Sequence, residues 1–493
     1  MTSSLPRRTP ESGRRYDLLI VGAGPAGLSA AGGAARCGAR VALIERNVLG
    51  GTCLNTGCIP SKTIIRTSRL YREMRDAERF GGQVPSGITV DFPAVMKRVR
   101  RVRARLGEFV SAERLVAMGI DVYVGEARFA GPDAVTVGAQ VLRFKNALIA
   151  TGAHPVTPPI PGLANAGFLT YENVFDLTEC PKRLLVIGGG PVGCELAQAF
   201  ARLGSRVTVV QDEPMFLGQE ERDAAQLLSD AFTRDGIEIH LDTQTTRVRI
   251  DGSDTIVDLL NNGLPHTIAV DRILVGVGTA PNVRNLGLDA ARVAYDDARG
   301  IPVDDFLRTT NRHIFAAGDV CTEHKFPHIE SVAGRIVVAN ALFWGRQRLS
   351  AQVVPWCTFT DPEIAHVGMY VTEAREKNVP IKTFTVLMHE VARAIADGEE
   401  DGFVKIHVRE GTGEILGATV VAAHAGDLIN EISLAMSAGL DLQALGRVNV
   451  PYPTQSQAIT MAAGAFVQPR PNALRTWLRT KWRSWSSRPA RRG

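Results

Sequence analysis

The stretch Gly50-Gly51-Thr52-Cys53-Leu54-Asn55-Thr56-Gly57-Cys58-Ile59-Pro60-Ser61-Lys62 holds two cysteines five positions apart. A disulfide requires its two Cα atoms to lie within roughly 7 Å of each other. An undistorted helix would hold residues five apart at roughly 8–9 Å. The chain must therefore bend between Cys53 and Cys58 if their sulfurs are to bond, and Gly57 is the residue that permits a bend. Pro60 suits the start of the helix that follows. We predict a redox-active dithiol rather than two unpaired core cysteines.

A dinucleotide-binding fingerprint precedes this motif by about one βαβ unit. The apolar segment 16–21 predicts a buried parallel strand and 40–45 predicts a second one. Three glycines follow the first strand at once: Gly22, Gly24 and Gly27. Such glycines let the backbone approach a pyrophosphate at a helix N-terminus. Glu45, which ends the second strand, can accept hydrogen bonds from an adenosine ribose.

The same pattern recurs about 165 residues later. Strands are predicted at 183–187 and 206–210, and between them lie Gly188, Gly190 and Gly193. Two dinucleotide sites together with a dithiol indicate an electron relay from an exchangeable nicotinamide to a tightly bound flavin. An internal duplication with one inactive site is the alternative.

Chain order predicts that the first nucleotide-binding domain is interrupted by the second. A strand at 145–152 ends in Thr151-Gly152, a proline-rich stretch follows it, and a later strand at 311–319 ends in Asp319. The texture changes near 355, where mixed strands and helices indicate an α+β domain. We therefore predict an α/β chain with two Rossmann-like domains and a C-terminal α+β domain. The predicted boundaries are 15–155 with 285–354 (FAD), 156–284 (NAD(P)), 355–468 (C-terminal domain) and 469–493 (basic tail).

Composition excludes several classes of function. The formal net charge is +5, but the segment 470–493 carries eight basic and no acidic residues, so the remainder is slightly negative. This argues against a nucleic-acid-binding body. The seven scattered cysteines do not indicate a secreted disulfide framework. We find no secretory signal or membrane-spanning run and no resident metal motif. A cytoplasmic location is expected.

These motifs together resemble the class I flavoprotein disulfide reductases, and mercuric-reductase-like members in particular. The similarity runs from about residue 15 to 468. The resemblance is strongest in the two glycine loops, the Cys53/Cys58 motif, the segment 355–368 and the segment 417–426. It implies that the C-terminal α+β domain is a dimerisation domain, and that the protein is a homodimer in which the C-terminal segment completes the partner's active site.

The resemblance implies FAD and NAD(P)H as cofactors and a role for each motif. It assigns hydride transfer to the flavin, electron transfer on to Cys58, and substrate attack as a thiolate to Cys53. It pairs Lys62, near the flavin, with Glu195. The implied FAD contacts are Gly22, Gly24, Gly27, Glu45, Gly51, Thr52, Lys62, Thr151, Gly152 and Asp319. The implied nicotinamide-nucleotide contacts are Gly188, Gly190, Gly193, Gln211 and Gly278.

The chain departs from the disulfide-reducing pattern near its C-terminal end. Relatives carry two histidines and a glutamate where this chain has Val450, Tyr452 and Gln457. Histidine is suited to protonate a leaving thiolate near neutral pH, whereas tyrosine is a poor base because its ordinary pKa is about 10. Tyr452 resembles the tyrosine of mercuric reductases, where soft thiolates hold the metal. It is either a catalytic residue or a packing residue between two prolines.

The nicotinamide preference is predicted to favour NADH slightly. Gln211 ends the strand where an acid would hold a ribose 2′-hydroxyl. Acidic residues follow it, and no Lys or Arg occurs before Arg222, whereas a 2′-phosphate requires a cation. The sequence Gly278-Thr279-Ala280-Pro281-Asn282 lacks the arginine that relatives carry after this glycine.

Two basic stretches remain. The segment 97–105 is predicted to be the solvated face of a helix over an apolar stripe, and a polyanion contact is the alternative. The segment 470–493 places Trp and Leu on one helical face and Arg on another, which is typical of a peripheral membrane helix. A frayed terminal tail is the alternative.

We thus predict an FAD-dependent NAD(P)H oxidoreductase that passes electrons through Cys53 and Cys58 to a small-molecule acceptor, a soft metal or a thiol- or disulfide-type substrate. An NAD(P)H oxidase or quinone diaphorase is one alternative. A redox-sensing flavoprotein without substrate turnover is another.

Overall fold

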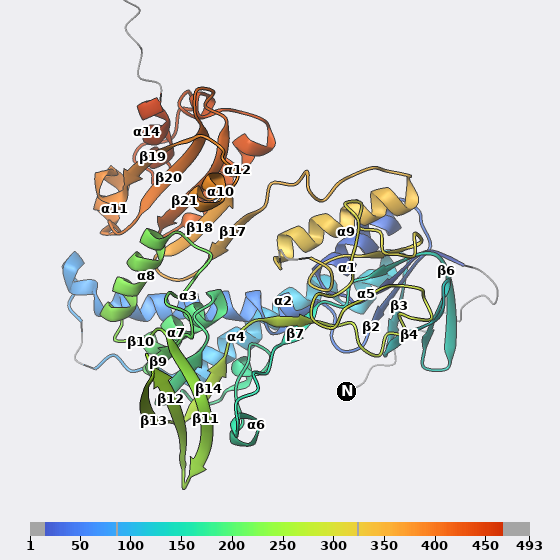
Figure 1. Ribbon diagram of the computed structural model, residues 1–493, viewed down its shortest axis with the longest axis horizontal. Helices are drawn as coiled ribbons and strands as arrows, with labels where there is room; N and C mark the ends of the chain where they lie inside the picture. The colour runs from blue at the N-terminus through green and yellow to red at the C-terminus, as the bar shows by residue number, and fades with distance from the viewer. Residues whose placement is uncertain (1–14, 85–86, 323–324, 467–493) are drawn as a thin grey trace, which may run out of the picture. The chain divides into compact units, whose positions relative to one another are not determined.

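The computed structural model describes residues 15–84, 87–322 and 325–466 (Figure 1). The chain divides into two compact units, and the boundary in the sequence falls between Pro362 and Glu363. The predicted fold class is confirmed: the first unit contains two nucleotide-binding α/β sheets, and the second is α+β. The basic tail, for which the sequence allows membrane contact, lies outside the described residues. Within those residues, no helix combines the length and apolar character that crossing a bilayer requires.

The first sheet is built around a parallel core in which the predicted strands are confirmed. Its strand order is β3-β2-β1-β6-β5-β4, and β16 also pairs with β6. The strands are β1 (Tyr16–Val21), β2 (Val41–Glu45), β3 (Ile120–Val124), β4 (Ala127–Gly131), β5 (Ala134–Val137), β6 (Gln140–Ile149) and β16 (Ile314–Ala316). Because β16 returns to this sheet beside β6, it brings Asp319 to the same edge as the first glycine loop.

Two helices cover one face of this sheet, α1 (Pro25–Arg36) and α9 (Pro327–Leu342). They approach closely because Gly334 has no side chain: a Cβ there would lie 2.4 Å from the Ala26 carbonyl oxygen. The middle of α9 therefore packs against the N-terminal half of α1.

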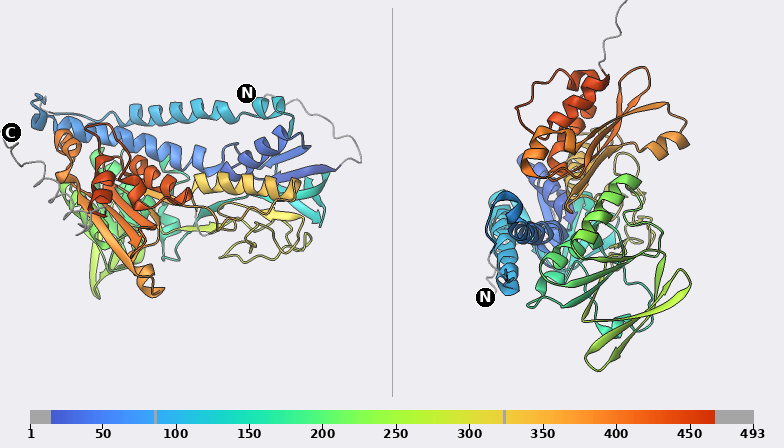
Figure 2. Two further views of the ribbon diagram at one scale, coloured as in Figure 1. Left: turned by 90° about the horizontal axis from the view of Figure 1, so that it is seen from above. Right: turned by 90° about the vertical axis from the view of Figure 1, so that its left-hand side faces the viewer.

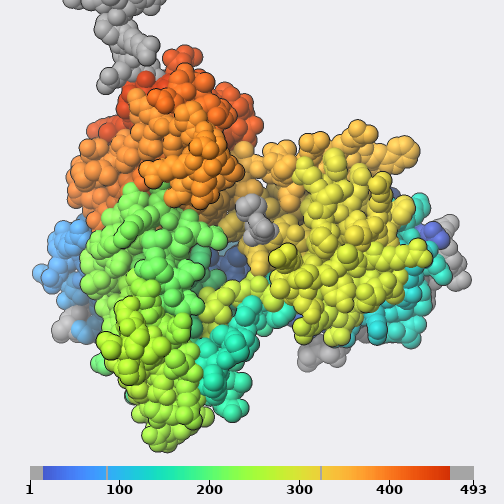
Figure 3. Space-filling model, viewed as in Figure 1, coloured from blue at the N-terminus to red at the C-terminus, as the bar shows by residue number. Residues whose placement is uncertain are grey.

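The second nucleotide-binding sheet lies between β6 and β16 in the chain. Its parallel strands have the order β10-β9-β8-β14. A three-stranded meander, β11-β12-β13, projects from it at the lower end of the view in Figure 3. The elements are β8 (Arg183–Ile187), α7 (Pro191–Arg202), β9 (Arg206–Val210), α8 (Arg222–Arg234), β10 (Glu238–His240), β11 (Thr243–Asp251), β12 (Asp254–Asn261), β13 (Leu264–Val270) and β14 (Arg272–Val275).

The dithiol motif lies on a pair of helices, α2 (Gly51–Asn55) and α3 (Cys58–Arg75). Helix α4 (Phe92–Gly107) runs beside α3 (Figure 2) and buries the predicted apolar stripe. The prediction that its basic face is merely solvated is wrong for two arginines. Arg98 donates to the Thr63 carbonyl at 2.9 Å, and Arg103 donates to the Asn55 carbonyl at 3.2 Å. Helix α4 thus braces both redox helices.

The second unit is an antiparallel sheet with helices packed on it. Strands β18 (Glu363–Gly368), β21 (Ile415–Ala422), β20 (Phe403–Arg409) and β19 (Ile381–Leu387) are neighbours in that order. Helix α12 (Ala425–Ser437) packs on β18 and β21, and α14 (Gln457–Phe466) packs on β19 and β20. The shorter helices are α10 (Val371–Glu376), α11 (Ala392–Asp397) and α13 (Leu442–Leu445).

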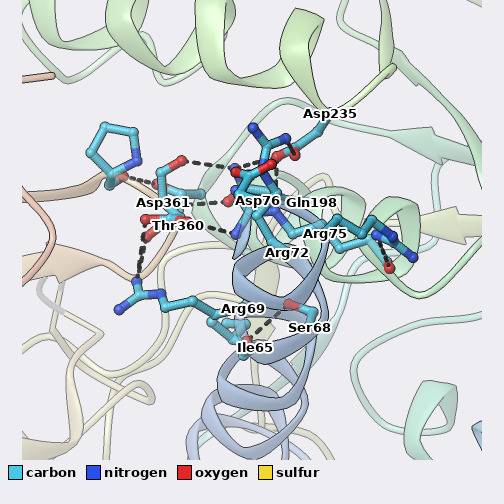
Figure 4. Close-up of polar contacts among 12 residues, drawn as sticks. Ile65, Ser68, Arg69, Arg72, Arg75, Asp76, Gln198, Asp235, Thr360 and Asp361 are labelled. Atoms are coloured by element: carbon cyan, nitrogen blue, oxygen red, sulfur yellow. Dashed lines mark hydrogen bonds and ion pairs between the residues drawn. The ribbon is translucent and has the colours of Figure 1, made fainter. Parts of the chain in front are cut away.

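A cluster of ion pairs holds the far end of α3 against the second nucleotide-binding domain (Figure 4). Arg72 and Arg202 both pair with Asp235, each at 2.9 Å, and Arg202 also pairs with Asp361 at 2.7 Å. The Asp235 side chain is only 2% exposed and that of Arg202 only 6%. Breaking a buried ion pair from one side is strongly destabilising because the other charge is left unpaired.

We expect Arg202→Ala to lower the free energy of unfolding by about 3 kcal/mol, since it removes a partner of the buried Asp235 carboxylate and of the partly exposed Asp361 carboxylate. The measurement is chemical denaturation of the purified protein. Arg183→Ala is the matched control because Arg183 pairs with two aspartates at a more exposed site. We expect this variant to lower the free energy of unfolding by no more than about 1 kcal/mol. Equal losses in the two variants would contradict this interpretation of the cluster.

Candidate redox site

The backbone breaks between the two cysteines, as the sequence predicts. Helix α2 ends at Asn55 and α3 begins at Cys58, with Gly57 as its N-cap at φ −115° and ψ −110°. A Cβ on Gly57 would lie only 3.0 Å from the Thr52 carbonyl oxygen. The bend therefore depends on glycine, and it turns Cys58 back toward Cys53.

The two sulfurs are close enough to share a hydrogen bond, and both cysteines are free thiols in this structure. This hydrogen bond, with help from the Lys62 ammonium, outweighs burial and lowers the pKa of Cys58 to about 7. The same hydrogen bond, together with burial, raises the pKa of Cys53. In the reduced pair the proton thus stays on Cys53 and the negative charge on Cys58. Cys53 needs a proton acceptor before it can attack as a thiolate.

The partly exposed Lys62 forms an ion pair with the buried carboxylate of Glu195. Lys62 Nζ lies 2.8 Å and 3.1 Å from the two carboxylate oxygens of Glu195, whose side chain is 6% exposed. Although burial opposes the charge of Lys62, the carboxylate raises its pKa. Glu195 also accepts a hydrogen bond from the backbone N–H of Phe359 at 2.9 Å, and Lys62 lies over the Phe359 ring. The ammonium is thereby held one helical turn beyond Cys58.

The first glycine loop forms a cradle that side chains would fill. A Cβ on Gly27 would lie 1.9 Å from the Gly22 carbonyl oxygen, and one on Gly22 would lie 2.2 Å from the Ala150 oxygen. Gly24 is the N-cap of α1, so the helix begins at a residue without a side chain. A Cβ on Gly51 would lie 2.6 Å from Gly24 Cα. The dithiol segment therefore starts in backbone contact with the pyrophosphate-type loop.

Each of the two glycine loops is held by a hydrogen bond from a backbone N–H of the loop to a side-chain oxygen. A carboxylate oxygen of Glu45 accepts a hydrogen bond from the N–H of Ala23 at 2.8 Å. The side-chain oxygen of Gln211 accepts one from the N–H of Gly189 at 2.7 Å. In both domains a side chain at the carboxyl end of the second strand, Glu45 or Gln211, thus fixes the residue that follows the first glycine. Sequence reasoning treated both side chains as ribose ligands and missed this supporting role.

The second loop repeats the cradle of the first. A Cβ on Gly193 would lie 2.1 Å from the Gly188 carbonyl oxygen, and one on Gly188 would lie 2.6 Å from the Gly276 oxygen. Gly190 is the N-cap of α7. Because α7 carries Glu195 in its second turn, this loop and the dithiol helix are joined through the Lys62–Glu195 pair.

The connection between the two nucleotide-binding domains brings two predicted motifs together. Asn282 donates to the Thr151 carbonyl oxygen at 2.9 Å, and the Thr151 hydroxyl donates to the Asn282 carbonyl oxygen at 2.8 Å. The N–H of Asn282 also donates to the carbonyl oxygen of Gly152 at 2.9 Å. Short strands β7 (Ala153–Pro155) and β15 (Thr279–Pro281) pair beside them, just after Gly278. Hydrogen bonds of Asn282 therefore hold this connection together, although the chain lacks the arginine that relatives carry after the glycine that corresponds to Gly278.

Asp319 lies at the carboxyl edge of the first sheet, beyond β16. Its Oδ1 atom is buried and has no hydrogen-bond partner in the described part of the chain. An orphaned buried acceptor at this edge indicates that a polar ligand completes the site. The other side of this carboxyl group hydrogen-bonds to Glu330 in the first turn of α9, a residue that sequence reasoning missed.

Two predicted site residues stand apart from this geometry. The Thr52 side chain is exposed in the first turn of α2. Tyr452 belongs to the second unit, where it is 75% exposed. Its exposure fits a residue presented to something outside its own unit rather than one that packs in a core.

Fold and site together define a flavoprotein-type disulfide oxidoreductase. Residues 16–340 match the family described as pyridine nucleotide-disulphide oxidoreductase, and residues 354–463 match the dimerisation domain of that family. The chain belongs to the pyridine nucleotide-disulphide oxidoreductase family. It is therefore an oxidoreductase, and its dimerisation domain supports a homodimer.

Individual relatives agree with this assignment. A mercuric reductase of Staphylococcus aureus is 33% identical over 451 residues, which cover 92% of this chain and 82% of the relative. Among solved structures, LpdA of Mycobacterium tuberculosis has a TM-score of 0.84 and 29% identity, covering 91% of this chain and 99% of that one. A Cu(II) complex of the HOCl-induced flavoprotein disulfide reductase RclA of Escherichia coli has a TM-score of 0.81 and 28% identity, with 92% and 100% coverage.

The family uses FAD and NAD(P)H, and the residues present fit both cofactors. Three features of the first domain fit a dinucleotide with a polar chain: the glycine cradle, the start of α1 without a side-chain cap, and the buried Asp319 oxygen that has no partner among the described residues. The second cradle, at α7, repeats this geometry and fits a second pyrophosphate. The dithiol segment, tied to the first loop and ion-paired to the second, lies between them.

We expect Lys62→Met to raise the pH midpoint at which Cys58 becomes a thiolate above the wild-type value of about 7. The substitution removes the ammonium that lowers the pKa of this thiol and leaves Glu195 unpaired beside it. The measurement is the pH dependence of iodoacetamide labelling at Cys58 in reduced protein, read by peptide mass spectrometry. Lys145→Met is the control, since Lys145 pairs with Asp17 at an exposed position. An unshifted midpoint in Lys62→Met would refute the electrostatic role of Lys62.

Proposed function

We propose that this protein uses NADH to reduce a soft metal ion or a thiol-bound electrophile through the Cys53–Cys58 dithiol. The observation that supports this most directly is the hydrogen-bonded sulfur pair on a glycine-dependent bend beside the FAD loop. Bound FAD would supply a carrier that accepts a hydride from the nicotinamide and passes an electron pair to sulfur. The proposed roles of the chain are to hold the cofactors, orient the sulfurs and control their protons.

Each proposed residue has a distinct task. Cys58 holds the negative charge on the cofactor side, and its thiolate is stabilised by Cys53 and Lys62. Cys53 is the sulfur that meets the substrate. Glu195 holds Lys62 in place and joins the nicotinamide loop to the dithiol helix. Two thiolates side by side suit a soft metal such as Hg(II) or copper.

The soft-metal substrate class is supported by two further arguments. Mercuric reductases are among the relatives, and the RclA structure is a Cu(II) complex. The chain has Tyr452 where disulfide-reducing relatives have an acid–base histidine, and metal capture by thiolates depends less on a proton donor. We further propose a cytoplasmic homodimer in which Tyr452 of one subunit faces the dithiol of the other.

We expect anaerobic Hg(II) reduction by the holoenzyme with NADH, and a fall in kcat of at least about a hundredfold in both Cys53→Ser and Cys58→Ser. Each substitution removes one sulfur of the pair that holds the metal. Volatile elemental mercury and NADH oxidation are both measured. Cys37→Ser, which alters an exposed thiol, is expected to keep wild-type activity.

Other outcomes of that experiment favour the alternatives. Quinone or oxygen reduction that survives in Cys53→Ser, with no mercury release by wild type, would support an oxidase or diaphorase. Failure of both NADH and NADPH to reduce the holoenzyme would support a redox-sensing protein without turnover.

We expect kcat/KM to be higher for NADH than for NADPH, and Asp212→Arg to move the ratio toward NADPH by about tenfold, or 1.4 kcal/mol. Gln211 is already engaged with Gly189, and Asp212 and Glu213 would repel a 2′-phosphate. Steady-state kinetics with both nucleotides give the ratio. Asp230→Arg on α8 is the control for a general gain of positive charge. A wild-type preference for NADPH would overturn the proposed nucleotide choice.

A further inference from the structure

A cavity of about 460 Å³ lies at the amino edge of the first sheet, beside β6 and β16. The first glycine loop follows the carboxyl end of β1 and Asp319 follows that of β16, so the cavity is at the edge of the sheet opposite the FAD loop. It shares no residue with either glycine loop. The residues that give this cavity its character are Lys145, Arg308, Arg312, His313, Trp344 and Arg346.

The walls of the cavity are tied to one another by hydrogen bonds within the protein. The N–H of Ala147 in β6 donates to the carbonyl oxygen of His313, just before β16, at 2.9 Å. The Asn146 side chain donates to the Ala341 carbonyl oxygen at 3.2 Å, and the last turn of α9 accordingly lies beside β6 in Figure 1. A cavity whose walls are fixed in this way needs little reorganisation to receive a ligand.

The turn that follows α9 is built around a buried amide side chain. Asn340 is only 6% exposed, and its amide donates to the carbonyl oxygens of Phe306 at 3.1 Å and Gln347 at 2.9 Å. Its side-chain oxygen accepts from the N–H of Gln347 at 3.0 Å. A Cβ on Gly345 would lie 2.8 Å from the Ala339 carbonyl oxygen, so the turn depends on glycine as well. The conformation of this segment is therefore set by the fold.

This fixed turn presents a tryptophan to solvent at the cavity. Trp344 is 92% exposed and has a φ of +53°, a left-handed conformation that is unfavourable for a bulky side chain. Its indole gains almost no burial in return. Such an outlier at a cavity is evidence for a function, since an asparagine or glycine would suit the same backbone better. An exposed indole face stacks on planar rings, and on nucleobases of any identity.

The cavity also gathers cations that have few partners. Among the described residues, the side chains of Arg312 and Arg346 form neither an ion pair nor a hydrogen bond. Arg308 adds a third guanidinium, and Lys145, which pairs with Asp17 at 2.7 Å, lines the same space. None of the described lining residues is acidic. An anion bound among these guanidinium groups would relieve their mutual repulsion, and guanidinium groups match the geometry of phosphate oxygens.

We propose that this cavity binds a nucleoside polyphosphate, with its phosphate groups on Arg308, Arg312 and Arg346 and its base stacked on Trp344. The site is additional to the two dinucleotide-binding loops. It does not depend on the proposed redox function, because it lies apart from the dithiol and from both cofactor loops.

The size of the cavity and the charge of the chain favour a small molecule over a nucleic acid. A volume of about 460 Å³ is in the range of small-molecule sites. A nucleic-acid duplex needs an extended basic surface, whereas the chain outside the segment 470–493 is slightly negative. A free nucleotide offers both a ring and several phosphates within the reach of one cavity.

The test is isothermal titration calorimetry of the FAD-loaded protein at low ionic strength, with saturating NAD⁺ to occupy the second glycine loop. The probes are CTP, cytidine and inorganic tripolyphosphate. We expect CTP to bind most tightly, tripolyphosphate more weakly and cytidine most weakly, because only CTP uses both the cations and the indole. Raised salt is expected to weaken CTP binding.

Variants separate the two halves of the site. We expect the double variant Arg312→Ala/Arg346→Ala to weaken both CTP and tripolyphosphate at least about tenfold. Trp344→Ala is expected to weaken CTP about tenfold and to leave tripolyphosphate unchanged, since only the base contacts the indole. Arg143→Ala is the control, because it removes an exposed arginine that pairs with Asp133 away from the cavity, and it is expected to bind CTP as wild type does. Equal FAD content and equal unfolding midpoints show that each variant is folded.

Three results would overturn the proposal. The first is no CTP binding to the NAD⁺-saturated protein, and the second is CTP affinity that is unchanged in Arg312→Ala/Arg346→Ala. The third is much tighter binding of a single-stranded oligonucleotide than of CTP, which would assign the surface to nucleic acid instead. Equal weakening of CTP and tripolyphosphate in Trp344→Ala would contradict the stacking of a base on the indole.

Discussion

The backbone break at Gly57 is the constraint on which the rest of the site depends. It turns a continuous helical segment into α2 and α3, and it brings the sulfurs of Cys53 and Cys58 into one hydrogen-bonded pair. Every charge around the dithiol acts through that pair. Without the bend, Cys58 would lose the hydrogen bond with Cys53 that does most to lower its pKa.

Electrostatics then divides the two sulfurs into different roles. Lys62 is a cation held in place by a buried carboxylate, so its charge remains available to Cys58. Glu330 has the opposite effect, because its negative charge raises the pKa of Cys53 and so opposes a second thiolate. The cation of Lys62 and the nearby carboxyl group of Glu330 together favour a single negative charge on the reduced cysteine pair. This separation is what a two-sulfur relay between a cofactor and a substrate requires.

Much of the fold and part of the site could be predicted from the sequence. The glycine fingerprints with their flanking strands gave β1, β2, β8 and β9, because that spacing has few structural solutions. The bend at Gly57 followed from the reach of a disulfide. The bracing of α2 and α3 by Arg98 and Arg103 could not be predicted, since a basic helix face has no signal for which arginines turn inward. Glu330 was also missed, because a single glutamate in a helical segment gives no sign that the fold will bury it beside Asp319.

The central claim is that an electron pair from a nicotinamide is delivered to Cys53 and Cys58. An anaerobic titration of the oxidised holoenzyme with NADH, quenched at each step with an alkylating agent and counted by peptide mass spectrometry, tests it directly. The account predicts that the first equivalent of NADH produces two new labelled thiols, one at Cys53 and one at Cys58. Reduction of the flavin with no new thiol at either position would contradict it.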